Sequence, residues 1–146
     1  MRMIDVGKKK ITERKAIVEG RIRLCSSVIN MIKQKKVPKG DVLEAAKIAG
    51  ILAVKNTPHI IPLCHPIPIE YVNIEFLPGK EEIKIVTTVK GNAKTGVEME
   101  ALTATTVSAL TIYDMCKMLD KEISITEIKL MKKTGGKSGT YVRKEK

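Results

Sequence analysis

The sequence predicts an α+β fold of the ferredoxin-like type, in which an antiparallel sheet carries its helices on one face. Alternating apolar and polar residues mark the strands, apolar residues at helical spacing mark the helices, and Pro- and Gly-containing turns separate them. The expected order is β-α-α-β-β-α-β, the split βαβ pattern of that fold with one additional helix. The second face of such a sheet must be wet or covered by a partner.

The first third of the chain is expected to begin with a strand and a short helix. Residues 13–24 partly alternate and predict the strand. Ser26 or Ser27 can cap a helix that runs to about Lys35, because a serine side chain can accept a hydrogen bond from the first helical turn. Residues 37–40, with the sequence Val-Pro-Lys-Gly, break this helix.

A second helix is expected to start at Asp41, which forms a capping box with Glu44 three residues later. The helix should end at about Asn56, because the residue before a proline disfavours helical geometry and Pro58 follows. Residues 58–68 contain four of the six prolines and predict a stiff loop.

The second half predicts a hairpin, a long helix and a last strand. Residues 69–77 and 82–89 alternate cleanly on either side of a Pro-Gly turn. Residues 96–119 lack internal Gly and Pro and show helical periodicity. Residues 123–130 predict a strand with a bulge, and a basic, Gly-rich tail follows from about Thr134.

Length and composition predict a single domain of residues 1–146 with no internal repeat. Hydrophobic residues make up 43% of the chain, enough for a core, but no apolar run approaches the roughly 20 residues of a membrane span. No secretory signal is apparent at the N-terminus. Three widely spaced cysteines argue against a disulfide framework and a zinc site, so we expect a cytoplasmic protein: Cys25, Cys64 and Cys116.

The net charge of +11 gathers at both ends of the chain, because residues 1–57 and 132–146 are basic and residues 58–131 are mildly acidic. A basic excess attracts nucleic acid, phosphorylated small molecules or acidic lipid. One Phe, three Tyr and no Trp offer little surface for stacking bases. The composition therefore favours a small phosphorylated ligand, with no nucleic-acid or membrane partner, although many lysines can simply keep a surface soluble.

The Pro-rich loop holds one candidate for proton transfer. His65 lies among prolines, and a rigid loop can aim an imidazole at a ligand. The alternative is a loop histidine bonded to a nearby carbonyl group. Cys64 is not expected to be a thiolate nucleophile, because adjacent side chains in an extended loop point apart. His59 lacks such a frame and is not expected to be functional.

The long helix carries acidic groups near its start and an acid–base pair near its end. Asp114 and Lys117 share a face and can exchange protons if both are desolvated, or they form an ordinary surface ion pair. Glu100 and Asp114 lie about 40° apart around the axis but about 21 Å apart along it. One small substrate cannot touch both on one helix, so a site containing both predicts an oligomer with interfacial active sites.

A Gly-rich segment over residues 132–139 can wrap phosphate oxygens through backbone N–H groups and lysine charge, or it is a flexible tail. It is not a Walker motif, because Met131 stands where that motif needs a glycine and few residues remain for the following helix. Residues 39–41 form a similar, weaker anion site at a helix start.

Three groups of segments together resemble the MoaC family of cyclic pyranopterin monophosphate synthases. The first is Ile48-Ala-Gly-Ile-Leu-Ala-Val-Lys-Asn-Thr with Ile61-Pro-Leu-Cys-His-Pro. The second is Gly96-Val-Glu-Met-Glu-Ala-Leu-Thr-Ala followed by Leu110-Thr-Ile-Tyr-Asp-Met-Cys-Lys. The third is Gly135-Gly-Lys-Ser-Gly. The similarity runs from Met3 through the Gly-rich tail, nearly the whole chain.

The resemblance implies a ferredoxin-like enzyme of molybdenum cofactor biosynthesis, a homohexamer built as a trimer of dimers with active sites at the dimer interface. Its substrate is 3′,8-cyclo-7,8-dihydroguanosine 5′-triphosphate. The lyase-type rearrangement yields the pterin product, cyclic pyranopterin monophosphate, and pyrophosphate. No cofactor is implied; Mg²⁺ is compatible with a triphosphate, but the sequence shows no dedicated carboxylate cage for a metal.

The resemblance also assigns residues. The family's catalytic aspartate falls on Asp114, with Lys117 as its companion. Its substrate-binding residues fall on Leu63, Cys64, His65, Glu98, Met99, Glu100, Lys39, Lys55, Lys133, Lys137 and Arg14. We expect the lysines to share one pocket, where crowding lowers their pKa values until one can act as a base. A basic RNA-binding module and a non-catalytic scaffold are the alternatives from other functional classes.

Overall fold

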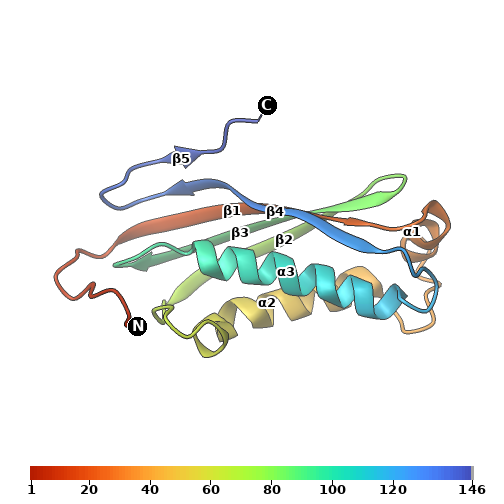
Figure 1. Ribbon diagram of the computed structural model, residues 1–146, viewed down its shortest axis with the longest axis horizontal. Helices are drawn as coiled ribbons and strands as arrows, with labels where there is room; N and C mark the ends of the chain where they lie inside the picture. Colours follow the sequence, from red (N-terminus) through yellow and green to blue (C-terminus); the bar gives the residue numbers. More distant parts are fainter. Residues whose placement is uncertain (146) are drawn as a thin grey trace.

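The computed structural model describes residues 1–145 and shows two layers, a sheet and a layer of helices (Figure 1). The elements are β1 (Thr12–Arg23), α1 (Ser26–Lys33), α2 (Val42–Ile60), β2 (Ile69–Pro78), β3 (Glu82–Ala93), α3 (Glu98–Cys116), β4 (Ser124–Thr134) and β5 (Tyr141–Val142). The strands lie in the order β2-β3-β1-β4-β5 and every pairing is antiparallel. The predicted α+β class with a ferredoxin-like order is confirmed.

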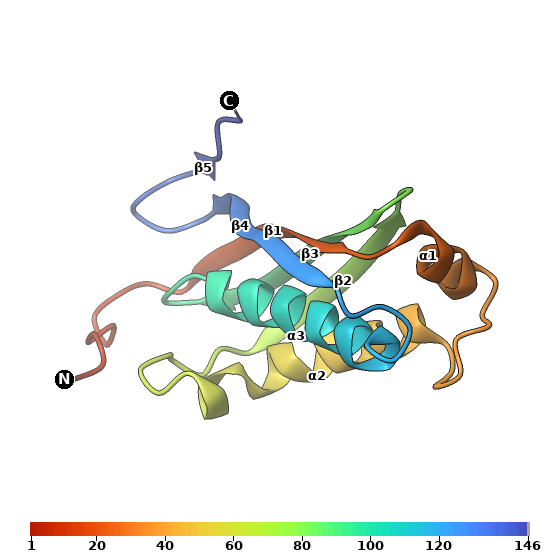
Figure 2. The same ribbon diagram turned by 45° about the vertical axis from the view of Figure 1, so that its right-hand side comes forward.

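Both long helices cover the same face of the sheet (Figure 2). The alternation in β1 explains this arrangement, because Ala16, Val18 and Ile22 point to the helices and are fully buried. The intervening residues lie on the open face, where Glu19 forms an ion pair with Lys84 at 2.9 Å. Such charged pairs allow this face to remain in water.

Helices α2 and α3 approach each other closely at Gly50. A Cβ atom at this position would lie 2.4 Å from both Ser108 Oγ and Ile74 Cδ1, so only glycine fits. The Ser108 hydroxyl donates a hydrogen bond to the main-chain oxygen of Ala46 at 3.0 Å, joining the two helices inside the core. The small residues of α2 therefore position α3 against both α2 and the sheet.

All three helices differ from the prediction at a boundary, and in α1 the N-cap is Cys25 rather than Ser26 or Ser27. The expected end of α2 at about Asn56 is wrong, because the helix continues through Pro58 to Ile60. A proline in the last turn removes only one backbone hydrogen bond, and the Thr57 hydroxyl donates to Ala53 O at 2.8 Å beside it. Helix α3 is shorter than expected at both ends, starting at Glu98 and ending at Cys116. No helix within residues 1–145 is long and apolar enough to span a membrane.

The predicted bulge in the last strand is confirmed. The register between β1 and β4 shifts twice, and Met131 is the extra residue at one of these shifts. Glu127, near the other shift, has a positive φ of 55°. Strand β5 was not predicted: its two residues pair with Lys132 and Lys133 at the edge of the sheet, and so short a segment carries no periodicity.

The helix contact predicts that Gly50→Ala destabilises the protein even though alanine has the higher helix propensity. We expect the free energy of unfolding to fall by about 1–3 kcal/mol, because the added methyl group must displace Ser108 and Ile74. Urea unfolding measures the change. Asn56→Ala, at an exposed position of the same helix, is the control and should change stability little. Equal stability of Gly50→Ala and the native protein would contradict the close contact.

Candidate active site

The predicted site residues do not form one pocket in a single chain. Most of them lie in two groups at opposite ends of α3, and the 19 residues of this helix span about 27 Å. The group at its C-terminal end, here called the aspartate cluster, consists of Lys39, Asp114 and Lys117. The group at its N-terminal end, here called the glutamate cluster, consists of Arg14, Cys64, Glu98, Glu100, Lys133 and Lys137. The expected shared lysine pocket is therefore divided by the length of the helix.

In the aspartate cluster, two ammonium groups hold one carboxylate. Lys117 Nζ lies 2.8 Å from Asp114 Oδ1, and Lys39 Nζ lies 3.3 Å from Asp114 Oδ2. Lys39 also donates to the main-chain oxygen of Asp114 at 2.8 Å. Hydrogen bonds from Lys117 and then Lys39 lower the pKa of Asp114, so the carboxylate is ionised at neutral pH.

The same contact raises the pKa of Lys117, because its hydrogen bond to Asp114 stabilises the ammonium form. This direction is opposite to the lowered pKa expected from crowded lysines. Within one chain Lys117 is therefore suited to donate a proton rather than to accept one. The side chains of Asp114 and Lys117 are 59% and 56% exposed, so the cluster lies open on the surface of the single chain.

In the glutamate cluster, Glu100 is only 1% exposed, although it lies in the first turn of α3. Neither carboxylate oxygen has a hydrogen-bond partner within residues 1–145. Burial raises the pKa of Glu100 to about 7; nearby Glu98 adds to this shift and the main-chain amide of Glu100 opposes it. The desolvation of the carboxyl group thus outweighs the favourable helix dipole, and Glu100 can gain or lose a proton near neutrality.

The Leu63-Cys64-His65 segment reaches the same end of α3. Burial, with Glu100 and Glu98 nearby, raises the pKa of the Cys64 thiol, in agreement with the expectation that it is not a thiolate. His65 Nε2 lies 2.7 Å from the main-chain oxygen of Ile4. Since a carbonyl group can only accept, Nε2 donates in this bond, which is the arrangement named as the alternative for a loop histidine. The N-terminal segment therefore lies against the predicted histidine.

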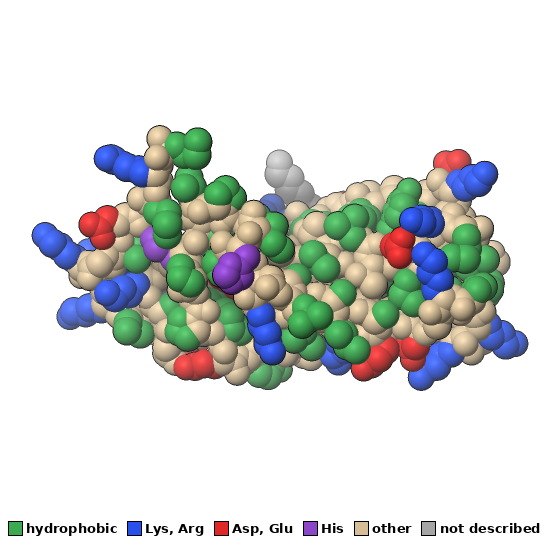
Figure 3. Space-filling model, turned by 90° about the horizontal axis from the view of Figure 1, so that it is seen from below, with side chains coloured by type: hydrophobic (Ala, Val, Ile, Leu, Met, Phe, Trp, Pro, Cys, Tyr) green, Lys and Arg blue, Asp and Glu red, His purple; other side chains and the backbone are tan. Residues whose placement is uncertain are grey.

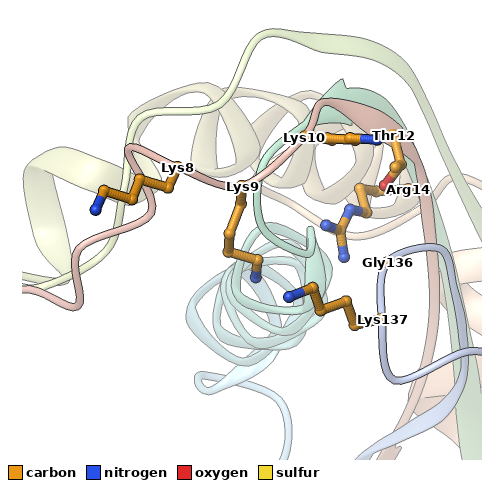
Figure 4. Close-up of a pocket in the computed structure, with 7 residues that line it drawn as sticks. All are labelled: Lys8, Lys9, Lys10, Thr12, Arg14, Gly136 and Lys137. Atoms are coloured by element: carbon orange, nitrogen blue, oxygen red, sulfur yellow. The ribbon is translucent and has the colours of Figure 1, made fainter.

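A basic cavity of about 550 Å³ lies next to the glutamate cluster (Figure 4). It is lined by Lys8, Lys9, Lys10, Thr12, Arg14, Gly136 and Lys137. Arg14 is only 7% exposed and donates to the main-chain oxygens of Lys94 at 3.1 Å and Gly135 at 3.3 Å. The side chains of Lys9, Arg14 and Lys137 converge, whereas Lys8 points away from them. The cavity brings cations together without a carboxylate in its lining.

A smaller cavity of about 150 Å³ connects this basic lining to the start of α3. It shares Lys9, Arg14 and Lys137 with the larger cavity and adds Glu98 and Lys133, whose charged groups lie 3.9 Å apart. The two cavities thus adjoin each other, and their linings together lead from the basic surface to the acidic start of α3. Sequence reasoning missed the lysines of residues 8–10, and their only signal was a run of three lysines before the first strand.

Besides His65, three predicted residues lie outside both clusters. Lys55 projects from α2 into a groove beside β2 that also contains Ile51 and Tyr71. Leu63 and Met99 are 43% and 37% exposed near the start of α3. Within residues 1–145, no group of three or more His, Cys, Asp or Glu side chains is arranged to hold a metal ion.

The burial of Glu100 predicts a pH-dependent stability. The native state binds a proton up to a pH of about 7, whereas an unfolded glutamate releases it near 4.5, so the free energy of unfolding falls as pH rises through this interval. We expect the ionisation of Glu100 to lower the free energy of unfolding by about 3 kcal/mol over this interval. Glu100→Gln should remove this dependence on pH. Urea unfolding between pH 5 and pH 8 measures it. Glu75→Gln, an exposed control, should keep the native profile, and a Glu100→Gln profile parallel to the native one would refute the assignment.

Comparison with known proteins shows the family of the chain. Residues 3–136 match the model of the MoaC family. A cyclic pyranopterin monophosphate synthase of Peptoclostridium acidaminophilum is 52% identical over 142 residues, covering 97% of this chain and 90% of the relative. Proteins of the same name from Brevibacillus brevis and Thermoanaerobacter sp. are 49% and 52% identical, each covering at least 97% of this chain and 91% of the relative. The chain therefore belongs to the MoaC family.

Proposed function

We propose that this protein is an enzyme that converts 3′,8-cyclo-7,8-dihydroguanosine 5′-triphosphate into cyclic pyranopterin monophosphate and pyrophosphate, in molybdenum cofactor biosynthesis. The observation that carries the proposal is the path between the basic cavity and the glutamate cluster. A nucleotide-derived substrate has two ends that match these two parts of the site. Its polyanionic end matches the basic cavity, and its purine-derived end, which can donate and accept hydrogen bonds, matches the glutamate cluster. The names of the relatives support the same activity.

The basic cavity is the proposed place for the triphosphate. Arg14 presents a buried, planar guanidinium group, and Lys9 and Lys137 approach the same space from two other segments. Cations positioned in advance stabilise the negative charge that develops when pyrophosphate leaves. Lys133 lies where the path meets α3 and would contact the part of the substrate nearest the ribose.

The glutamate cluster is the proposed place for the purine-derived ring system. Glu100 can accept a hydrogen bond as a carboxylate or donate one as an acid, because its pKa of about 7 lies at the working pH. His65 lies in the segment that reaches this end of α3, and Cys64, Glu98 and Met99 border the same end. These groups would orient the ring during its rearrangement.

The aspartate cluster is the proposed acid–base centre. Asp114 is held as a carboxylate, so it can accept a proton, and Lys117 is held as an ammonium group, so it can donate one. Ring opening and pyranopterin closure require proton removal at one atom and proton delivery at another. Lys39 contacts the same carboxylate and would add positive charge toward the substrate phosphates.

A complete site then requires a second copy of the chain, because the helix places Glu98 and Asp114 about 24 Å apart. Each site would take its aspartate cluster from one subunit and its glutamate cluster from another. Exposed hydrophobic side chains of α2 and α3 support such an assembly: Ile48, Leu52, Leu110 and Tyr113. Figure 3 shows hydrophobic side chains spread over the face of the molecule on which the two helices lie. We propose the family's hexamer, a trimer of dimers, with each chain acting as one domain.

Mg²⁺ would enter with the triphosphate, since phosphate oxygens are ligands that this ion prefers. We place the protein in the cytoplasm, because its three cysteines are free thiols and a nucleotide-derived substrate is expected there: Cys25, Cys64 and Cys116.

The proposed centre predicts that Asp114→Ala loses turnover while the fold is retained. We expect a loss of about 10³-fold, the range of general acid–base catalysis, because no other carboxylate contacts Lys39 or Lys117 within residues 1–145. The measurement follows pyrophosphate and cyclic pyranopterin monophosphate formation from the cyclic dihydroguanosine triphosphate. Glu75→Ala is the control at an exposed carboxylate. A folded Asp114→Ala variant with native turnover would remove Asp114 from the mechanism, and an inactive native hexamer would remove the enzymatic proposal.

The composite site predicts recovery of activity on mixing two inactive variants. In a dimer of Asp114→Ala with Lys137→Ala, one of the two interfacial sites receives both substitutions and the other receives neither. Random pairing then restores about a quarter of the native activity. The measurement is turnover after the two proteins are unfolded together and refolded. Mixtures that stay as inactive as the separate variants would show that each site is built from one chain.

A further inference from the structure

The loop that carries Lys137 has little structure of its own to hold it in place. It joins β4 to the two-residue strand β5, and Gly135 and Gly136 have positive φ angles of 101° and 79°. Glycine adopts such angles without strain but also moves readily between conformations. A short hairpin of this kind is marginally stable alone, so other contacts must keep Lys137 directed into the basic cavity.

Arg14 supports the loop from the side of β1. Its Nη1 atom donates to the main-chain oxygen of Gly135 at 3.3 Å. A Cβ atom at Gly136 would lie only 2.2 Å from the same nitrogen, so the loop backbone packs directly on the guanidinium group. This contact fixes the beginning of the loop. It does not reach the far end of the loop, toward β5.

Arg143 supports the far end. Its main-chain N–H donates to Met131 O at 2.8 Å, and its side-chain Nε donates to Leu130 O at 2.7 Å. Met131 is the extra residue of the bulge in β4, so Arg143 bridges the point where the regular register between β1 and β4 is interrupted. The side-chain bond spans 13 residues and closes the hairpin that contains Lys137.

A neighbouring ion pair contributes less to this closure. Lys129 Nζ lies 3.4 Å from Glu145, whose side chain is 63% exposed, and exposed ion pairs of this kind add little stability. Of these two side-chain contacts, the half-buried hydrogen bond of Arg143 therefore contributes more to holding the hairpin closed.

We propose that Arg143 is a positioning residue: it holds the β4–β5 hairpin closed so that Lys137 stays in the basic cavity and binds the polyphosphate end of the substrate. The proposal rests on the proposed function in one respect, that this cavity receives a polyphosphate. Arg143 itself does not line the cavity, so its effect on binding must pass through the loop and Lys137.

Inorganic triphosphate tests the proposal without relying on catalysis. Calorimetric titration of the assembled protein compares the native chain, Arg143→Ala and Lys144→Ala; the last removes an adjacent positive charge and is the matched control. We expect Arg143→Ala to bind about fivefold more weakly, because the loss of one hydrogen bond shifts the closed loop by about this factor. Lys144→Ala should change the affinity by less than about twofold. Amide hydrogen exchange over residues 135–142 should be faster in Arg143→Ala than in the native chain, and unchanged in Lys144→Ala.

A double-mutant cycle separates positioning from a general structural effect. In a Lys137→Ala background, adding Arg143→Ala should weaken triphosphate binding no further, because the residue through which it acts is gone. Equal and additive losses in both backgrounds would overturn the proposal. So would unchanged loop exchange in Arg143→Ala, unchanged affinity, or the absence of triphosphate binding by the native protein.

Turnover distinguishes this proposal from the proposed function. If the native enzyme converts the cyclic dihydroguanosine triphosphate, Arg143→Ala should lower kcat/KM about fivefold, because Lys137 is proposed to contact the phosphate end both in the bound substrate and as pyrophosphate leaves. An unchanged kcat/KM would overturn the positioning role. The native protein could bind triphosphate, with non-additive effects of Arg143→Ala and Lys137→Ala, and still give no turnover. In that case the proposed function fails and the role of Arg143 stands.

Discussion

Helix α3 is packed against β1 and β3 along its length, and this contact determines where each chemical group of the site lies. Its inward side chains are small or apolar and fully buried, among them Ala101, Ala104 and Ile112. In the middle of this face, the Thr105 hydroxyl donates to the Thr87 hydroxyl at 2.8 Å and satisfies both groups inside the core. A helix held in this way cannot bend to bring its ends together. The separation of the aspartate and glutamate clusters is therefore a direct consequence of core packing.

The same helix holds two carboxyl groups in opposite protonation regimes. Asp114 is exposed and paired with two ammonium groups, which lower its pKa, whereas Glu100 is buried without a partner and its pKa rises to about 7. The pKa values of the two carboxyl groups thus shift in opposite directions, because ammonium groups stabilise one carboxylate and burial destabilises the other. Enzymes that perform acid and base steps at one pH need such a division. Here the two groups meet only if subunits combine.

The proposed polyphosphate side of the site depends on weaker structure than the helix side. Arg14 is anchored in β1 and buried, but Lys137 is carried by a Gly-rich loop outside the regular sheet. The bulge in β4 and the short strand β5 supply the remaining order. A loop of this kind can yield to a large anion and still present a lysine toward it. The rigid and adaptable halves of the site therefore match a substrate with a rigid ring system and a flexible phosphate chain.

The sequence alone was sufficient for the fold class, the order of the elements and the bulge in the last strand, because alternation and helical spacing are local signals. It also indicated that Glu100 and Asp114 cannot meet on one helix, since the rise per residue is constant. It did not reveal that α2 continues through Pro58, that β5 exists, or that Lys8, Lys9 and Lys10 line a cavity. The cavity arises from contacts between residues that are distant in the chain, as does the raised pKa of Glu100, which needs a complete core around it. Only the tertiary structure decided them, because burial and the approach of separate segments leave no periodic trace in a sequence.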